Sequence, residues 1–233
     1  MSAVQNIDNK SFIKSSGEGE VLGRVAGAGI VPMVGGSDGV VVLEEAACSV
    51  ADVLAERGKL SEGEVRAVGV EAANALARVH EAGLIHCDVK AANLLLSHDG
   101  QLWLADFDAA APANGMPLVR GTHALAELAP RAEVAADILG LAVTLVQLAT
   151  GLEIDLRVAW TSADLNRIGC PPMLSSDIAM ALGSQETGEF TMTWFATLLG
   201  RYRDPLRLPK PVVPSINDDL PETIDYPALK SAG

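Results

Sequence analysis

Four polar residues between positions 88 and 106 have the side chains that phosphoryl transfer requires. They are Asp88, Lys90, Asn93 and Asp106. A carboxylate beside the attacking hydroxyl can accept its proton, and a cation can neutralise charge on the phosphoryl group in transit. Amide and carboxylate oxygens are ligands that Mg²⁺ prefers. These residue types therefore indicate transfer of a phosphoryl group from a nucleotide that carries Mg²⁺.

The surrounding pattern predicts that a helix and a β-hairpin position these four residues. Ser61 and Glu64 have the spacing of a capping box, and the apolar residues that follow recur at helical intervals until near Gly83. Two short β-like runs, 94–96 and 101–104, flank a turn and predict the hairpin. The first three polar residues lie in the loop between these elements and can face one cleft, while the fourth follows the second strand.

Three further elements can be predicted along the chain. Residues 31–43 read as strand, glycine-rich turn and strand, which predicts another hairpin. Ser49 is a candidate N-cap for a short helix over 50–57. Residues 137–150 are apolar nearly all round and end at Gly151, so we expect a helix in the centre of a domain.

The loop residues lie in a motif that resembles the catalytic loop of eukaryotic-type Ser/Thr protein kinases. The motif is His86-Cys87-Asp88 with Lys90 and Asn93. The resemblance implies that Asp88 accepts the proton of the substrate hydroxyl and that Lys90 steadies the γ-phosphate. It also implies that His86 packs the loop in the core.

Asp106-Phe107-Asp108 resembles the metal-binding motif of the same family. The resemblance implies that Asn93 and Asp106 bind Mg²⁺, and that Phe107 and Asp137 are structural supports. Asp137 would accept hydrogen bonds from the backbone of the catalytic loop. Asp108 stands where the family has glycine, and it is either an extra metal ligand or a local hydrogen-bond acceptor.

The small lobe of the family is recognisable in a shortened form. Phe12-Ile13-Lys14 resembles the strand whose lysine holds the nucleotide phosphates, and Glu18 is the candidate for its glutamate partner. Because only a few residues separate the two, we expect a helix cut to a turn or two. Leu43 would then be the gatekeeper, and Glu44 to Ala46 would form the hinge that hydrogen-bonds adenine.

The glycine-rich lid of the family has no clear equivalent. Residues 1–11 contain no glycine, so the nucleotide would be uncovered on one side. In a competing alignment, Gly17 to Val25 is the lid, but the next lysine is then Lys59. The first alignment is favoured because it also accounts for the run from Ile30 to Gly35 before the hinge.

The resemblance implies an α+β, two-lobed kinase fold with a reduced, β-rich small lobe and a mainly helical large lobe. We assign residues 1–47 to the small lobe, 48–208 to the large lobe and 209–233 to an acidic, proline-rich extended tail. The implied function is ATP- and Mg²⁺-dependent phosphorylation of a protein Ser or Thr, with Mn²⁺ as an alternative metal. Two alternatives remain, a pseudokinase scaffold and a small-molecule phosphotransferase that resembles the aminoglycoside kinases.

The composition of the chain indicates which classes of partner and which cellular compartment to expect. The chain has 233 residues, 17 Lys plus Arg and 30 Asp plus Glu, for a formal net charge of −13. This charge argues against nucleic acid and favours a basic protein substrate. The longest apolar window is interrupted and the three cysteines are scattered, so we expect no membrane span and a cytoplasmic protein. A partner or second subunit that completes the small lobe is a further hypothesis, motivated by the absent lid.

Overall fold

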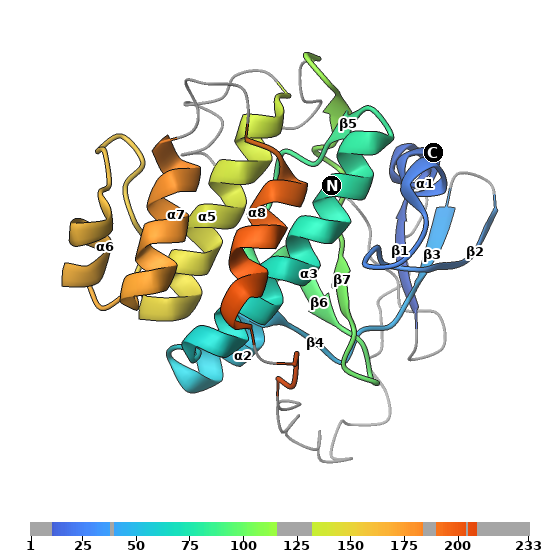
Figure 1. The fold of residues 1–233 in the computed structure, drawn as a ribbon. Coiled ribbons are helices and arrows are strands. Elements are labelled where there is room, and N and C mark those ends of the chain that lie inside the picture. Colours follow the sequence, from blue (N-terminus) through green and yellow to red (C-terminus); the bar gives the residue numbers. More distant parts are fainter. Residues whose placement is uncertain (1–10, 38–39, 116–131, 184–189, 204, 209–233) are drawn as a thin grey trace, which may run out of the picture.

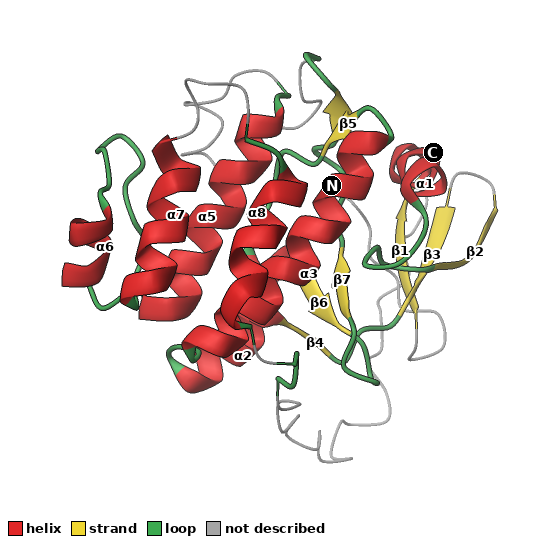
Figure 2. Ribbon diagram, in the orientation of Figure 1, coloured by secondary structure: helices red, strands yellow, loops and turns green. Residues whose placement is uncertain are grey.

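The computed structural model of the chain describes residues 11–37, 40–115, 132–183, 190–203 and 205–208. A small sheet-rich part stands beside a larger helical part (Figures 1 and 2). This arrangement confirms the predicted α+β fold with a reduced small lobe. The boundaries assigned to the lobes remain predictions, and the tail beyond residue 208 lies outside the described residues.

The small part is a three-stranded antiparallel sheet with one helix against it. Its strands lie in the order β1 (Ser11–Ser15), β3 (Val40–Glu44), β2 (Met33–Ser37). Strands β2 and β3 form the hairpin predicted from the sequence, with a register shift between Met33 and Gly35. Helix α1 (Ser16–Val25) follows β1 directly and buries Leu22 and Val25. Its ten residues make it somewhat longer than the one or two turns expected.

Two capped helices begin the larger part. Helices α2 (Val50–Arg57) and α3 (Glu62–Glu81) each start with a capping box. Ser49 and Ser61 accept hydrogen bonds from the backbone three residues on, and the acidic residues there bond back to the cap. These caps satisfy amide groups that the first helical turn leaves unpaired, which is why the sequence signals placed the helix starts correctly.

Short strands connect α3 to the next helix. Strands β6 (Leu94–Leu96) and β7 (Leu102–Leu104) form the second predicted hairpin, and β4 (Cys48–Ser49) pairs with β6. The 3-10 helix η1 (Ala91–Asn93) precedes this hairpin. Strand β5 (Leu84–Ile85) pairs with β8 (Ala111–Pro112).

Helix α5 (Val134–Thr150) lies inside the helical part and is buried along most of its length. It begins three residues before the predicted start and ends, as expected, at Gly151 in a left-handed conformation. Helices α3 and α7 (Pro172–Gly183) pack against it, and α8 (Met192–Leu199) packs against α3 and α7 (Figure 1). Helix α6 (Ser162–Arg167) packs on α7, and the 3-10 helix η3 (Gly200–Tyr202) ends the bundle. A continuous apolar core runs from the small sheet to α8.

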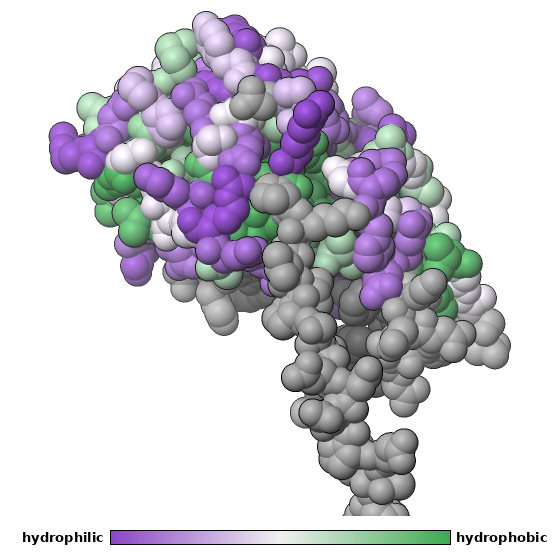
Figure 3. Space-filling view, turned by 90° about the horizontal axis from the view of Figure 1, so that it is seen from below, coloured by the Kyte–Doolittle hydropathy of each residue, from purple (hydrophilic) through white to green (hydrophobic). Residues whose placement is uncertain are grey.

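None of the described helices is long and apolar enough to cross a bilayer. Hydrophilic side chains cover much of the face seen in Figure 3, and apolar side chains show between them in smaller areas.

Candidate active site

The buried carboxylate of Asp137 holds the start of the catalytic loop. It lies in the first turn of α5 and is fully shielded from solvent. The backbone N–H groups of His86 and Cys87 donate to its two oxygens at 2.9 and 2.8 Å, and His80 Nε2 lies 2.8 Å from the carboxylate. These bonds fix Cys87 in the left-handed region, at φ 66°, which non-glycine residues rarely adopt. The loop is therefore anchored before it reaches Asp88.

The structure brings together the three polar residues of the loop, of which Asp88 and Lys90 are expected to act on the substrate and Asn93 to bind Mg²⁺. Lys90 Nζ donates to Asp88 Oδ2 at 2.5 Å. Asn93 Nδ2 donates to the Asp88 carbonyl oxygen at 2.8 Å and to Asp88 Oδ2 at 3.2 Å. Asp88 is 7% exposed, whereas the side chain of Lys90 is 41% exposed. One carboxylate oxygen is thus held by a cation and an amide at the surface of the core.

His86 supports this loop from the interior. Its ring is fully buried and packs edge-on against Phe107, with the ring centroids 4.8 Å apart. The N–H of Asp88 donates to Nδ1 at 3.3 Å, so in the neutral ring Nε2 carries the proton and donates to the Ala105 carbonyl at 3.1 Å. Burial lowers the pKa of His86, because the imidazolium would lose its hydration. Burial therefore favours the neutral form of His86, with both ring nitrogens engaged inside the core.

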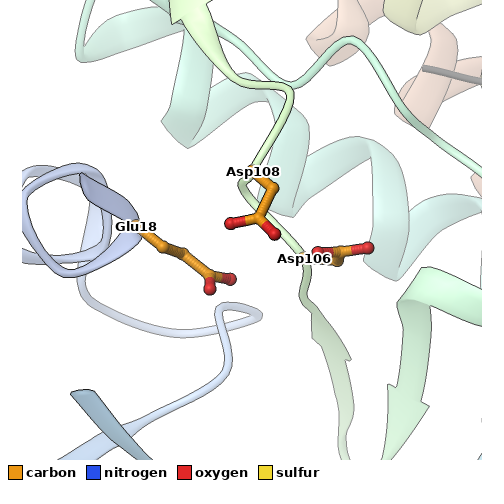
Figure 4. A group of neighbouring side chains, drawn as sticks. All are labelled: Glu18, Asp106 and Asp108. Carbon is orange, nitrogen blue, oxygen red and sulfur yellow. The ribbon is translucent and has the colours of Figure 1, made fainter. Parts of the chain in front are cut away.

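Three carboxylates gather where the metal-binding motif meets α1. Ligand oxygens of Glu18, Asp106 and Asp108 all lie within 4.8 Å of one another, and Figure 4 shows Glu18 reaching from α1 toward the two aspartates. Asp106 adopts φ 66° at the point where the chain leaves β7. Oxygen ligands of this kind suit a hard divalent cation. The sequence prediction had assigned Glu18 to a lysine partner and had left Asp108 open.

Glu18 also joins the small lobe to the metal-binding motif. Its side chain is 2% exposed, and Oε1 accepts a hydrogen bond from the backbone N–H of Phe107 at 3.1 Å. Lys14 lies on β1 opposite Val41 of β3, but its side chain lies outside the part of the chain that the structure describes. The Lys14–Glu18 ion pair therefore stays a prediction.

The competing alignment for the phosphate lid is wrong. The segment from Gly17 to Val25 lies within α1, and a helix cannot form the strand-turn-strand of a glycine-rich lid. Within the described residues, β1 pairs with β3 alone, so no strand covers its outer edge. Residues 1–10 and 116–131 lie outside the described part.

The predicted hinge connects the two parts. Leu43, the predicted gatekeeper, is buried on β3 and belongs to the apolar core. Glu44 is exposed, and its N–H donates to the Pro32 carbonyl at 2.9 Å. Ala46 is half-buried, and the next N–H, that of Ala47, donates to Leu96 at 2.7 Å. The segment is thus tied to the small sheet at one end and to the β6–β7 hairpin at the other.

Sequence reasoning missed the role of His80 at this site. His80 looked like a partly exposed polar residue, yet it reaches Asp137 across 57 positions of the chain. The sequence indicates only that His80 lies on the inward side of a long helix. This position does not identify Asp137 as the residue that it contacts. The contact between Glu18 and Phe107 was missed for the same reason.

Comparison with known proteins agrees with this geometry. Residues 7–154, more than half of the chain, match the protein kinase domain. The chain belongs to the protein kinase family. The kinase match includes the small sheet, the catalytic loop, the metal-binding motif and all of α5.

Curated protein kinases match parts of the chain. It is 44% identical over 61 residues to 3-phosphoinositide-dependent protein kinase 1 of Arabidopsis thaliana, which covers 26% of this chain and 12% of that protein. It is 36% identical over 111 residues to serine/threonine-protein kinase PknL of Mycobacterium tuberculosis, which covers 43% of this chain and 27% of that protein. The matched segments therefore span less than a third of these relatives.

Proposed function

We propose that the chain is an ATP- and Mg²⁺-dependent protein kinase that transfers the γ-phosphoryl group to a Ser or Thr hydroxyl. The observation that carries this proposal is the Asp88 carboxylate, bonded to Lys90 and Asn93 in a loop anchored by Asp137. Similarity to a relative that is named a serine/threonine-protein kinase supports the acceptor class.

Asp88 and Lys90 have complementary roles in this proposal. The Asp88 carboxylate orients the substrate hydroxyl and accepts its proton as the oxygen attacks. The ammonium of Lys90, held 2.5 Å from Asp88 Oδ2, is placed to neutralise charge on the transferred group. The hydrogen bonds of Asn93 to Asp88 hold the carboxylate in position, so little reorganisation is needed when substrate binds.

The donor set fits Mg²⁺, or Mn²⁺ in its place. Both hydrogen bonds from Asn93 use its amide nitrogen, so the amide oxygen is the atom that it offers to a cation. Asp106 supplies a carboxylate, and Asp108 and Glu18 lie within 4.8 Å of it. When bound, the metal would neutralise nucleotide phosphate charge and orient the γ-phosphate. The mutual repulsion of the three carboxylates favours a cation among them.

The nucleotide would lie between the small sheet and the catalytic loop. In this proposal Lys14 holds the α- and β-phosphates and Leu43 limits the depth of the adenine site. The main chain of Glu44 to Ala46 hydrogen-bonds the adenine.

We further propose that a second subunit or partner covers the outer edge of β1. The net charge of −13 also favours basic protein substrates.

The test is a phosphotransfer assay with γ-labelled ATP and Mg²⁺, with generic protein acceptors and aminoglycosides run side by side. Wild-type protein is compared with Asp88→Asn, Asp106→Asn and, as a matched exposed control, Asp155→Asn. We expect label on protein Ser or Thr with wild type and control, and a loss of at least about a hundredfold with the two site variants. Label on aminoglycosides alone would indicate a small-molecule kinase. No transfer and no nucleotide-dependent thermal shift would indicate a pseudokinase.

A further inference from the structure

A cavity lies beside the hinge, where the small sheet meets the β6–β7 hairpin. Its volume is about 360 Å³, which lies within the range of about 300–1,000 Å³ usual for small-ligand sites. Its walls come from the loop 27–30 after α1, from Glu44 at the end of β3, and from the turn 98–101 with Trp103 on β7. None of the four catalytic-loop and metal-binding candidates lines it.

Glu44 is one of the residues that line this cavity. Successive residues of a strand point to opposite faces, so the buried side chain of Leu43 and the exposed side chain of Glu44 lie on different sides of β3. The role proposed for Glu44 in nucleotide binding uses its main chain. Its carboxylate therefore lies on the face of β3 opposite Leu43, and the role proposed in nucleotide binding does not use it.

Asp99 provides a second carboxylate from the other wall. It accepts hydrogen bonds from the Ser97 hydroxyl and from Gln101 Nε2, the latter at 2.8 Å. These hydrogen bonds, chiefly the one from Ser97, lower the pKa of Asp99. The turn thus presents a fixed negative charge to the cavity.

The remaining lining is suited to a flat cation. No Lys or Arg is among the lining residues, and His98 is the one titratable base there. Trp103, which is 6% exposed, is among the lining residues, and the guanidinium of Arg78 lies beside Gly27 at the edge of the site. The positive charge of Arg78 repels a cation from the Gly27 side, so a bound cation is expected on the side of Glu44 and Asp99.

We propose that this cavity binds an arginine side chain of a protein partner. A guanidinium can donate paired hydrogen bonds to carboxylates and stack on an aromatic ring, which an ammonium does less well. The two carboxylates come from elements more than fifty positions apart, so a single arginine would bridge the small sheet and the hairpin. The net charge of −13 attracts a basic partner to the surface.

Titration with N-acetyl-L-arginine amide tests this site without any need for kinase activity. The readout is the indole N–H resonance of Trp103, identified by its disappearance in Trp103→Phe. We expect a saturable shift at millimolar ligand, with Trp160 and Trp194 unchanged as internal references. N-acetyl-L-citrulline amide has the same length without the charge, and we expect it to give no shift.

Variants of the two carboxylates complete the test. Glu44→Gln and Asp99→Asn should each weaken binding about fivefold, while the exposed control Asp155→Asn should bind like wild type. The references Trp160 and Trp194 report whether each variant keeps its fold. Equal shifts with citrulline, wild-type affinity in both variants, or no saturable shift with the arginine derivative would each overturn the proposal.

Discussion

Two aspartates of the candidate active site differ in what surrounds them. Asp88 reaches the surface and has a cation beside it, so its carboxylate can meet a substrate. Asp137 is fully buried and accepts from the two backbone N–H groups of His86 and Cys87, and its task is to hold the chain. The chemistry assigned to Asp88 depends on the geometry that Asp137 imposes.

Asp137→Asn should therefore damage both stability and activity. The asparagine amide would turn an N–H donor toward a backbone N–H donor, and a buried donor without an acceptor is costly. We expect a loss of about 3 kcal/mol in the free energy of unfolding, measured by urea denaturation, together with loss of phosphotransfer. The exposed Asp155→Asn should change the free energy by less than about 0.5 kcal/mol. Equal stability of the two variants would show that Asp137 does not anchor the loop.

Helix α1 can approach the small sheet closely only because residue 19 is glycine. A Cβ atom at Gly19 would lie 2.3 Å from Val41 Cγ2, well inside van der Waals contact. The branched valine on β3 cannot swing away, so α1 would have to move. Since Glu18 on the same turn contacts Phe107, that movement would also disturb the metal-binding motif.

Gly19→Ala should lower the free energy of unfolding by about 1–3 kcal/mol and weaken phosphotransfer. Gly23→Ala on the same helix is the matched control, because its Cβ meets open space. There we expect stabilisation of about 0.5–1 kcal/mol, from the lower conformational entropy of the unfolded chain. Val41→Ala should relieve the clash, so the double variant should lose less than the sum of the single changes. Additive losses would contradict the contact.

The capping box of α3 makes part of the stability of the folded protein depend on pH. Hydrogen bonds from Arg57, with the backbone and hydroxyl of Ser61, lower the pKa of Glu64 from 4.5 to about 2. A lowered carboxyl pKa stabilises the folded state above the ordinary pKa, and that contribution is lost as the pH falls from 4.5 to 2. Because the Arg57 partner is partly exposed, we expect a contribution of about 1 kcal/mol.

Glu64→Gln should therefore be less stable than wild type by about 1 kcal/mol at pH 6, and the difference should shrink markedly at pH 3. Urea denaturation at both pH values measures it. Glu153→Gln, an exposed carboxylate outside any cap, should show no such change with pH. A difference that stays constant from pH 6 to pH 3 would mean that ionisation of Glu64 is not the cause.

Local sequence signals predicted several helices and strands well, but the sequence carried no signal for the long-range contacts. Both hairpins and the starts of α2 and α3 follow from turn residues and caps that lie within a few positions of one another. The kinase resemblance added the grouping of Asp88, Lys90 and Asn93. The sequence carries no comparable signal for the contact between Glu18 and Phe107, because burial and tertiary packing choose such partners.

The whole molecule is held together by charges as well as by its apolar core. The fully buried guanidinium of Arg66 donates from Nε to Glu62 at 2.9 Å and from Nη1 to Asp177 of α7 at 2.8 Å. Tyr202 of η3 lies over it, 5.5 Å from its central carbon to the ring centroid. One residue of α3 thus joins a distant helix and the end of the bundle. Sequence patterns place arginine at the surface, so this link was not predicted.

Substitution of Arg66 alone should lower the free energy of unfolding more than substitution of both Arg66 and its partner Asp177. Arg66→Met leaves the carboxylate of Asp177, which is 6% exposed, without its cation. We expect a loss of about 3–5 kcal/mol in the free energy of unfolding.

The double variant Arg66→Met with Asp177→Leu leaves no buried charge at this contact. Two apolar side chains can pack there, so much of the lost stability should be recovered. The exposed pair of Arg167 and Asp164 is the control, where Arg167→Met should cost less than about 1 kcal/mol. If the double variant is no more stable than Arg66→Met, the buried pair is not what couples α3 to α7, and apolar packing alone would explain how the helical part holds together.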